Sequence, residues 1–209
     1  MTQSIWDDGI QSREEQHREE QHRQKRMSIL RVAARAFNTQ GYYKTTLVSL
    51  ADELNVTKPT LYYYVKNKDD ILDGILALAI EQFRELIRSS AGLDAVGLEK
   101  LRSFVLHYGE LVTDDFGTCL ILMRINAPED KFRQPYHDLS KEVYVGLQNI
   151  IQSGIEDGSI GEVDPKYTAS ALVATLNETA YWHLAEGRES PKDAAGKFFK
   201  VFENGLAAG

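Results

Sequence analysis

Residues 45–68 read TTLVSLADELNVTKPTLYYYVKNK and predict two short helices joined by a tight turn. In the first half, apolar residues recur at helical spacing and form one face: Leu47, Leu50, Ala51 and Leu54. The second half carries three lysines, and no Asp or Glu stands between residues 55 and 68. The chain has a formal net charge of −7, so an element cleared of acidic side chains indicates a contact surface for DNA.

Capping residues predict where both helices begin and end. Thr45 or Thr46 suits the first N-cap, because a hydroxyl there accepts an orphan backbone N–H. Asn55 falls where a left-handed residue ends that helix, a conformation that Asn tolerates. Thr57 caps the second helix, and Pro59 in its first turn loses no needed hydrogen bond. This is the pattern of a helix-turn-helix, whose second helix enters the major groove.

The segment 24–75 resembles the DNA-binding domain of TetR-like (TetR/AcrR) transcriptional regulators. The resemblance is carried by AARAFNTQGYYKTT at the end of the first helix and by LADELNVTKPTLYYYVKNKDDIL after it. Two residues depart from the family pattern: Asn55 replaces the usual Gly, and Tyr64 replaces a frequent His. The resemblance implies a ligand-responsive regulator, expected to be a repressor, that binds a palindromic operator as a homodimer and releases it when a small-molecule effector binds.

Composition agrees with an all-α protein. The chain has 209 residues, of which 43% are hydrophobic, so it can bury a core in one or two domains. Helical periodicity is widespread and alternating strand patterns are few. The apolar stretch at 71–80 is too short and too polar for a membrane span. The lone Cys119 excludes an intrachain disulfide, and we expect a cytoplasmic protein.

Charge is distributed unevenly along the chain. Residues 1–70 hold 11 Lys and Arg against 10 Asp and Glu, a net charge of +1, whereas residues 71–209 hold 13 against 21, a net charge of −8. An acidic body limits non-specific DNA binding and helps to hold one face toward the duplex.

The chain is expected to divide into three parts. Residues 1–23 form a charged, partly disordered extension, 24–70 the helix-turn-helix domain, and 71–209 a helical domain for effector binding and dimerisation. The helices expected after the helix-turn-helix are 68–89, 96–113, 116–126, 131–157, 166–186 and 191–206. Asp164-Pro165 and Ser190-Pro191 favour helix starts, since each pairs a capping residue with Pro at the first helical position.

The charged segment 13–26 leaves two interpretations open. It is either a solvated extension of the first helix or an arm whose Arg23, Lys25 and Arg26 reach phosphates or the minor groove.

The second helix of the helix-turn-helix offers distinct roles to its side chains. Lys58 projects from the first turn and is expected to reach a base edge, such as guanine O6 or N7. Thr57 and Thr60 could read a base or hold a phosphate, and Tyr62 could contact a thymine methyl group or a sugar. The residues expected at phosphates are Tyr63, Tyr64, Lys68 and a hydroxyl from Thr45 or Thr46.

An effector pocket is expected where polar or aromatic groups interrupt apolar helix faces. The candidates are His107, Tyr108, Leu111, Met123, Arg124, Tyr144, Asn177, Tyr181, Trp182 and His183. Each of them alone also fits packing. Arg124 stands between Met123 and Ile125, and a buried arginine needs an anion, so an acyl-CoA or an aromatic acid is a candidate effector. His107 and His183 lack metal-ligand spacing, and no metal site or cofactor is predicted.

In the predicted helix 166–186 small and large side chains alternate, which allows close approach of another helix. The last predicted helix, 191–206, is apolar on more than one side, which favours burial by a partner chain. The residues expected in a dimer interface are Tyr167, Ala171, Ala174, Phe198, Phe199, Phe202 and Leu206. The alternative is a last helix that is fully internal.

Two other function classes compete with DNA binding. An enzyme is disfavoured because the sequence has no phosphate-cradling glycine loop, nucleophile elbow or zinc-binding helix. A dyad of Cys119 and His107 is conceivable, although both fall on apolar helix faces. A helical adaptor that binds only protein remains the second alternative.

Overall fold

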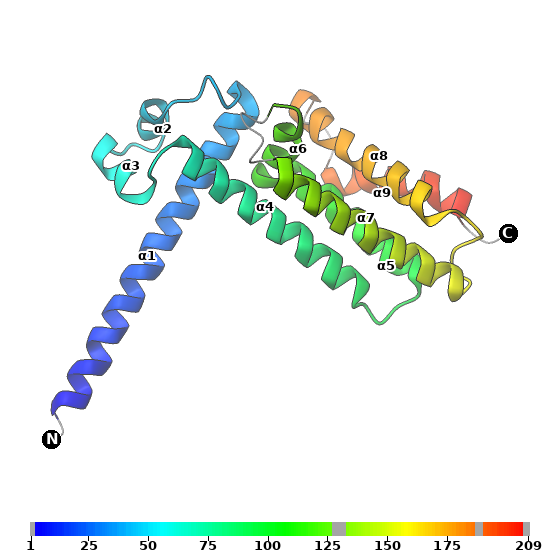
Figure 1. Cartoon of the computed structure of the whole chain (residues 1–209), viewed down its shortest axis with the longest axis horizontal. Coiled ribbons are helices and arrows are strands. Elements are labelled where there is room, and N and C mark those ends of the chain that lie inside the picture. Colours follow the sequence, from blue (N-terminus) through cyan, green and yellow to red (C-terminus); the bar gives the residue numbers. More distant parts are fainter. Residues whose placement is uncertain (1–2, 127–132, 187–189, 207–209) are drawn as a thin grey trace. The chain divides into compact units, whose positions relative to one another are not determined.

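The computed structural model describes residues 3–126, 133–186 and 190–206, with side chains described for 16–123, 134–181 and 190–204. Within these ranges the regular structure is helical throughout, which confirms the predicted all-α class (Figure 1). The helices are α1 (Gln3–Gln40), α2 (Leu47–Glu53), α3 (Lys58–Tyr64), α4 (Lys68–Ala91), α5 (Gly97–Thr113), α6 (Asp115–Asn126), α7 (Arg133–Glu156), α8 (Pro165–Glu186) and α9 (Pro191–Leu206). In the described residues, no helix is both long enough and apolar enough to cross a membrane.

The chain divides into two compact units, residues 1–75 and 76–209. The division falls five residues after the predicted boundary at Asp70, because α4 packs on α1 over its first two turns. A Cβ at Gly74 would lie only 3.1 Å from Leu30 Cδ1. Helix α4 is therefore continuous between the units and contributes its first eight residues to unit 1.

Local chemistry fixes the helix-turn-helix in unit 1 as predicted. Thr46 is the N-cap of α2, and its hydroxyl accepts from the backbone N–H of Ser49 at 3.1 Å. Asn55 takes a left-handed conformation with φ 51° between the two helices. Thr57 is the N-cap of α3 and accepts from the Thr60 N–H. The buried core of this unit includes Ile29, Leu30, Ala33, Ala34, Phe37, Leu50, Ala51, Leu61 and Val65.

Helix α1 is longer than the sequence suggested. The sequence predicts a partly disordered extension over residues 1–23, whereas α1 begins at Gln3. Residues 3–40 contain no proline and many strong helix formers, so a helix that is anchored by its buried C-terminal half extends back to Gln3. In Figure 1 the N-terminal half of α1 continues well past α2 and α3.

Unit 2 is built around α5, which contacts α6, α7, α8 and α9. Fully or nearly fully buried side chains on its inner faces include Phe83, Leu101, Phe104, Val105, Val112, Leu147, Ile151, Leu172 and Leu176. Helices α5 and α7 approach very closely at Gly97 and Gly154: a Cβ at Gly97 would lie 2.2 Å from Gly154 Cα. The two predicted Pro starts are confirmed, since α8 and α9 begin at Pro165 and Pro191.

Candidate functional site

Helix α3 presents the predicted contact residues to solvent. Leu61 and Val65, four residues apart, are 0% and 2% exposed and turn one side of the helix inward. The opposite side carries Tyr62, which is 46% exposed, and Tyr63, which is 72% exposed. Thr57, Lys58 and Thr60 are also exposed. The arrangement leaves hydroxyls, phenols and an ammonium group free to meet a ligand surface.

Helix α3 itself carries one formal charge, the ammonium group of Lys58, and no carboxylate. Lys58 Nζ lies 6.0 Å from the centre of the Tyr62 ring. The first acids after α3 are Asp69, which accepts from the Tyr42 hydroxyl, and Asp70, which accepts from Arg26. Asp70 is neutralised by its ion pair with Arg26, whereas the neutral Tyr42 hydroxyl adds no positive charge beside Asp69, and Asp52 and Glu53 are exposed near the end of α2.

Thr45 and Lys68 have structural roles, contrary to their predicted place at phosphates. Thr45 is 1% exposed, and its hydroxyl donates to the Gly41 carbonyl at 3.0 Å. Lys68 Nζ donates to the carbonyls of Tyr42 at 2.9 Å and of Thr45 at 3.1 Å. It also lies 4.2 Å from the centre of the Tyr42 ring. Both side chains therefore close the turn before α2, and we leave them out of the contact surface.

Tyr42 adds a second bond to this turn. Its hydroxyl donates to Asp69, and burial, followed by this hydrogen bond, raises the pKa of Tyr42 far above its ordinary value. Tyr42 stays a neutral donor at physiological pH. The N-cap residue Thr46 remains exposed at the start of α2.

Arg26 fixes the C-terminal end of α3, a role that sequence reasoning missed. Its Nη1 donates to the Tyr64 carbonyl at 2.6 Å, and its Nη2 donates to Asp70 Oδ1 at 3.0 Å. Asp70 also accepts from the backbone N–H of Lys66 at 2.9 Å. The Arg26 guanidinium, followed by the Lys66 N–H, lowers the pKa of Asp70 against the opposing effect of burial. Arg26 is thus committed within unit 1, which removes it from the arm considered above.

Tyr64 is half-buried rather than open to a phosphate along its whole ring. Its ring centre lies 4.8 Å from that of His22 and 4.9 Å from that of Tyr63. Tyr64 therefore packs against α1 at the edge of the exposed surface.

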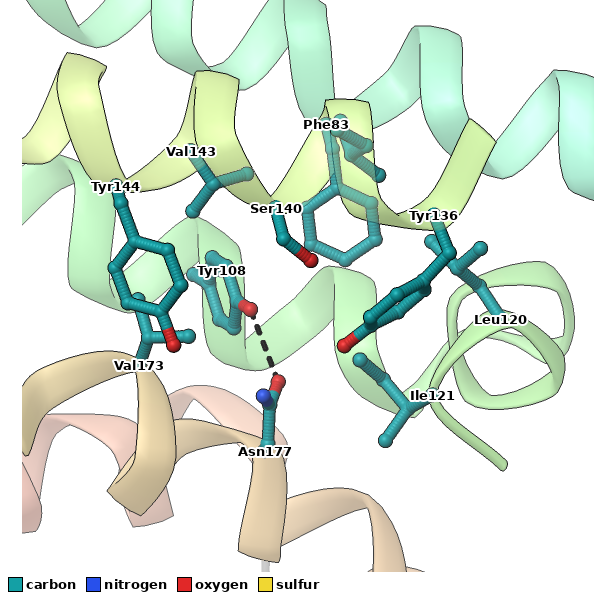
Figure 2. Close-up of a pocket in the computed structure, with 11 residues that line it drawn as sticks. Phe83, Tyr108, Leu120, Ile121, Tyr136, Ser140, Val143, Tyr144, Val173 and Asn177 are labelled. Atoms are coloured by element: carbon teal, nitrogen blue, oxygen red, sulfur yellow. Dashed lines mark hydrogen bonds between the residues drawn. The ribbon is translucent and has the colours of Figure 1, made fainter. Parts of the chain in front are cut away.

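Unit 2 contains a cavity among α4 to α8 (Figure 2). Its lining residues are Phe83, Tyr108, Leu120, Ile121, Tyr136, Leu139, Ser140, Val143, Tyr144, Val173 and Asn177. The Tyr108 hydroxyl donates to Asn177 Oδ1 at 2.9 Å, and both residues are buried. The cavity volume is about 20 Å³, room for roughly one water molecule, so a larger ligand must displace side chains.

The predicted pocket residues divide into three groups. Tyr108, Tyr144 and Asn177 line the cavity. His107 is exposed on α5, where its Nδ1 lies 2.7 Å from the Ser103 carbonyl, and so it faces away from the cavity. Leu111, Met123 and Tyr181 are in unit 2 outside the lining set, while the side chains of Arg124, Trp182 and His183 lie outside the described residues.

Sequence reasoning missed Phe83 on α4 and the α7 residues before Tyr144. Tyr136, Ser140 and Tyr144 are spaced by four residues and so lie on one face of α7. Figure 2 shows the rings of Tyr136 and Tyr144 on either side of the Tyr108–Asn177 hydrogen bond. This four-residue spacing of hydroxyl-bearing side chains is a signal in the sequence that could have predicted the cavity-lining face of α7.

The conceivable Cys119–His107 dyad is contradicted by burial. Cys119 is 0% exposed, and desolvation raises the pKa of its thiol to about 12, so the reactive thiolate is not formed near neutral pH. His107 hydrogen-bonds within α5 and lies on its exposed side.

The predicted dimer residues do not all share an outer face. Tyr167 is 72% exposed, and Ala171 and Ala174 are exposed on the same side of α8. Phe199 is 2% exposed, with its ring 5.6 Å from the Arg102 guanidinium, so it belongs to the core between α5 and α9. Val201, 72% exposed, takes the outward position on α9.

The remaining predicted interface residues, Phe198, Phe202 and Leu206, are not assigned to the outer face or to the core. Phe198 and Phe202 are half-buried, and the side chain of Leu206 lies outside the described residues. Helices α8 and α9 contact each other in unit 2.

Comparisons with known proteins cover both units. Residues 29–75 match the profile of bacterial regulatory proteins of the tetR family, and residues 94–206 match that of the tetracyclin repressor-like C-terminal domain. A fatty acid metabolism regulator protein of Bacillus subtilis (strain 168) is 26% identical over 157 residues, 74% of this chain and 81% of that protein. The HTH-type transcriptional regulator TtgR of Pseudomonas putida is 32% identical over 165 residues, 73% of this chain and 76% of TtgR.

Among solved structures, AibR in complex with isovaleryl coenzyme A and operator DNA has the same fold. The TM-score is 0.69 at 23% identity, and the match covers 83% of this chain and 95% of AibR.

Proposed function

Because the chain belongs to the TetR family of bacterial regulatory proteins, we propose that it is a repressor that binds a two-fold-symmetric operator as a homodimer and is released by a small-molecule effector. The observation that carries DNA binding is the exposed, acid-free face of α3, with Lys58, Tyr62 and Tyr63 outward and Leu61 inward. Such a helix can place side chains at base edges while its neighbours hold phosphates.

The cavity in unit 2 is the proposed effector site. Apolar side chains such as Phe83 and Val143 surround it, and the hydroxyls and amide of Tyr108, Tyr144 and Asn177 provide polar contacts. The acyl chain of an acyl-CoA or the ring of an aromatic acid matches the apolar part of this lining in character, and either ligand enters only when side chains move to enlarge the cavity of about 20 Å³. The names of two matched proteins, a fatty acid metabolism regulator and AibR with isovaleryl coenzyme A, support the acyl-CoA class.

Helix α4 is the proposed route of coupling. Its first turn carries Asp70, which anchors the end of α3 through Arg26, and its later turns carry Phe83 into the cavity lining. A ligand that moves Phe83 changes the preferred position of α4, and through Asp70 and Arg26 it changes the position of α3. A coupling free energy of about 1–3 kcal/mol changes DNA affinity roughly 5- to 150-fold, which is enough for a switch.

A homodimer is proposed through the outer faces of α8 and α9, where Tyr167 and Val201 are exposed. Two-fold symmetry repeats the α3 surface, so that two half-sites about one helical turn of DNA (~34 Å) or more apart are read together.

The test is to footprint the protein on DNA flanking its own gene at low salt. We expect a protected two-fold-symmetric site and affinity that falls steeply with added salt, because phosphate contacts release counterions. Acyl-CoAs of increasing chain length and benzoate are then added as probes, with release of the operator expected for at least one. Failure to bind any duplex at low salt would reject the DNA function and favour a protein-binding adaptor.

A further inference from the structure

The N-terminal part of α1 extends beyond the segment that matches the tetR-family profile. That match begins at residue 29, whereas α1 begins at Gln3 and runs to Gln40 without interruption. The residues before 29 add about seven helical turns, or ~39 Å, to unit 1. Figure 1 shows this segment continuing past α3.

This added segment of α1 contacts the exposed face of α3 directly. The His22 ring lies 5.4 Å from the Tyr63 ring in an edge-on arrangement and 4.8 Å from the Tyr64 ring. One turn later, Arg26 donates to the Tyr64 carbonyl. The side of α1 that bears His22 therefore adjoins Tyr63, one of the most exposed residues of α3.

Cations occupy the same side of the helix. Arg18, His22 and Lys25 are spaced as i, i+4 and i+7, so they form one strip, named here the α1 strip. Arg18 and Lys25 are exposed, and neither forms an ion pair with a described side chain.

One acidic side chain near the α1 strip, Glu20, is neutralised by Arg23, which lies on the other side of α1. Glu20 accepts from Arg23 and, at 2.9 Å, from Gln24. Arg23 projects about 140° and 160° around the helix from Arg18 and Lys25, at 100° per residue. Lys25 has no Asp or Glu within four residues, and Glu20 is paired away from the strip, whereas Arg18 stands one helical turn after Glu14 and Glu15 in the sequence.

We infer that the α1 strip is a second DNA-contact element, in which Arg18 and Lys25 bind phosphates beside those that α3 contacts. His22 lies between these two cations on the strip, and its ring packs against Tyr63 and Tyr64. The inference rests on the proposed DNA function. It favours duplex DNA as the occupant because the strip is cationic and continues a surface that has no acidic side chain from residue 55 to residue 68.

The test compares two double variants of the full chain on the footprinted operator duplex. Arg18→Ala/Lys25→Ala removes the strip, and Lys100→Ala/Lys141→Ala removes the same charge from unit 2. We expect the plot of log affinity of the homodimer against log salt to lose about 3.6 units of slope in the strip variant, at roughly 0.9 for each of four phosphate contacts (two per protomer), and well under 1 unit in the control. Thermal unfolding should be nearly unchanged in both.

An unchanged slope in the strip variant, with wild-type protein binding normally, would overturn this inference and leave the proposed function standing. Equal losses in the two variants would also overturn it, because the effect would then be one of net charge alone. Absence of DNA binding by the wild-type protein would reject both proposals.

Discussion

Arg26 on α1 and Asp70 on α4 form a two-point ion pair, with Nη2 3.0 Å from Oδ1 and Nη1 3.3 Å from Oδ2. The same guanidinium donates to the Tyr64 carbonyl, so the pair ties the end of the recognition helix to two other helices. The side chains are 30% and 26% exposed, which protects the pair from water more than a surface pair. The packing of α1, α3 and α4 in the DNA-binding unit therefore depends on Asp70.

Asp70→Asn is expected to destabilise unit 1 by about 2 kcal/mol at pH 7, because a charge-assisted hydrogen bond is weakened and Arg26 loses its counterion. The pKa of Asp70 is lowered in the folded state, so its contribution is present above the ordinary value of 3.8 and is lost as pH falls through the lowered pKa. The gap between wild type and variant should therefore close in acid. Urea unfolding with amide hydrogen exchange of residues 47–75 measures it.

The matched control is Glu142→Gln, which breaks the ion pair between Arg84 and Glu142 in unit 2. Both side chains are about two-fifths exposed, so solvent screens the pair and the expected cost is well below that of Asp70→Asn. An equal loss in the two variants at pH 7 would contradict the special role given to Asp70.

Lys58→Ala is expected to lower operator affinity by about 1–3 kcal/mol, roughly 5- to 150-fold, and to relax the preference at one base pair. Lys66→Ala is the control, since Lys66 is also exposed but follows α3. The loss of operator affinity in Lys66→Ala should be small and equal for all DNA sequences. Binding to a set of single-base operator variants separates the two outcomes, and a uniform loss for Lys58→Ala would make it a phosphate contact.

The fold was predictable because its decisive interactions are local. Thr46, Asn55 and Thr57 cap or turn the chain through atoms within three residues, and helical periodicity marks the core faces. Partner choice over long separations was not predictable. Lys68 donates to carbonyls 23 and 26 residues away, and Arg26 meets an acid 44 residues away.

The candidate sites show the same limit. Tyr108 and Asn177 were found as polar breaks in apolar faces, yet only the packing of α5 against α8 brings them together. Phe199 and Val201 both belong to an apolar helix, and sequence alone could not say that Phe199 turns inward and Val201 outward.

Tyr108→Phe is expected to cost about 1–3 kcal/mol of unit 2 stability, because Asn177 Oδ1 loses its donor in a buried place. Tyr108→Phe/Asn177→Leu should cost less than the sum of the single changes, since it removes both polar partners. A double-mutant cycle in urea gives the coupling. Tyr144→Phe serves as the control, because Tyr144 lines the same cavity without this bond, and a similar cost there would contradict the argument.

Val201→Glu is expected to weaken the proposed dimer by about 2 kcal/mol or more, roughly 30-fold, because a charge would be buried at the outer face of α9. Val145→Glu is the matched control on α7, where Val145 is 47% exposed. Sedimentation at several concentrations checks both. A dimer that resists Val201→Glu, or dissociates equally with Val145→Glu, would move the interface away from α9.

Gly97→Ala and Gly196→Ala are the same chemical change with opposite expected signs. At Gly97 a Cβ would meet backbone atoms of Gly154 at 2.2 and 2.3 Å, so α5 and α7 must separate at a cost of about 1–3 kcal/mol or more. At Gly196 the nearest atom would be Leu106 Cδ2 at an ordinary 3.5 Å. Gly196→Ala should therefore stabilise the folded protein by about 0.5–1 kcal/mol, because alanine lowers the entropy of the unfolded chain. Urea unfolding at one fixed protein concentration compares the two, and a Gly97→Ala variant as stable as wild type would mean that the close contact between α5 and α7 is wrong.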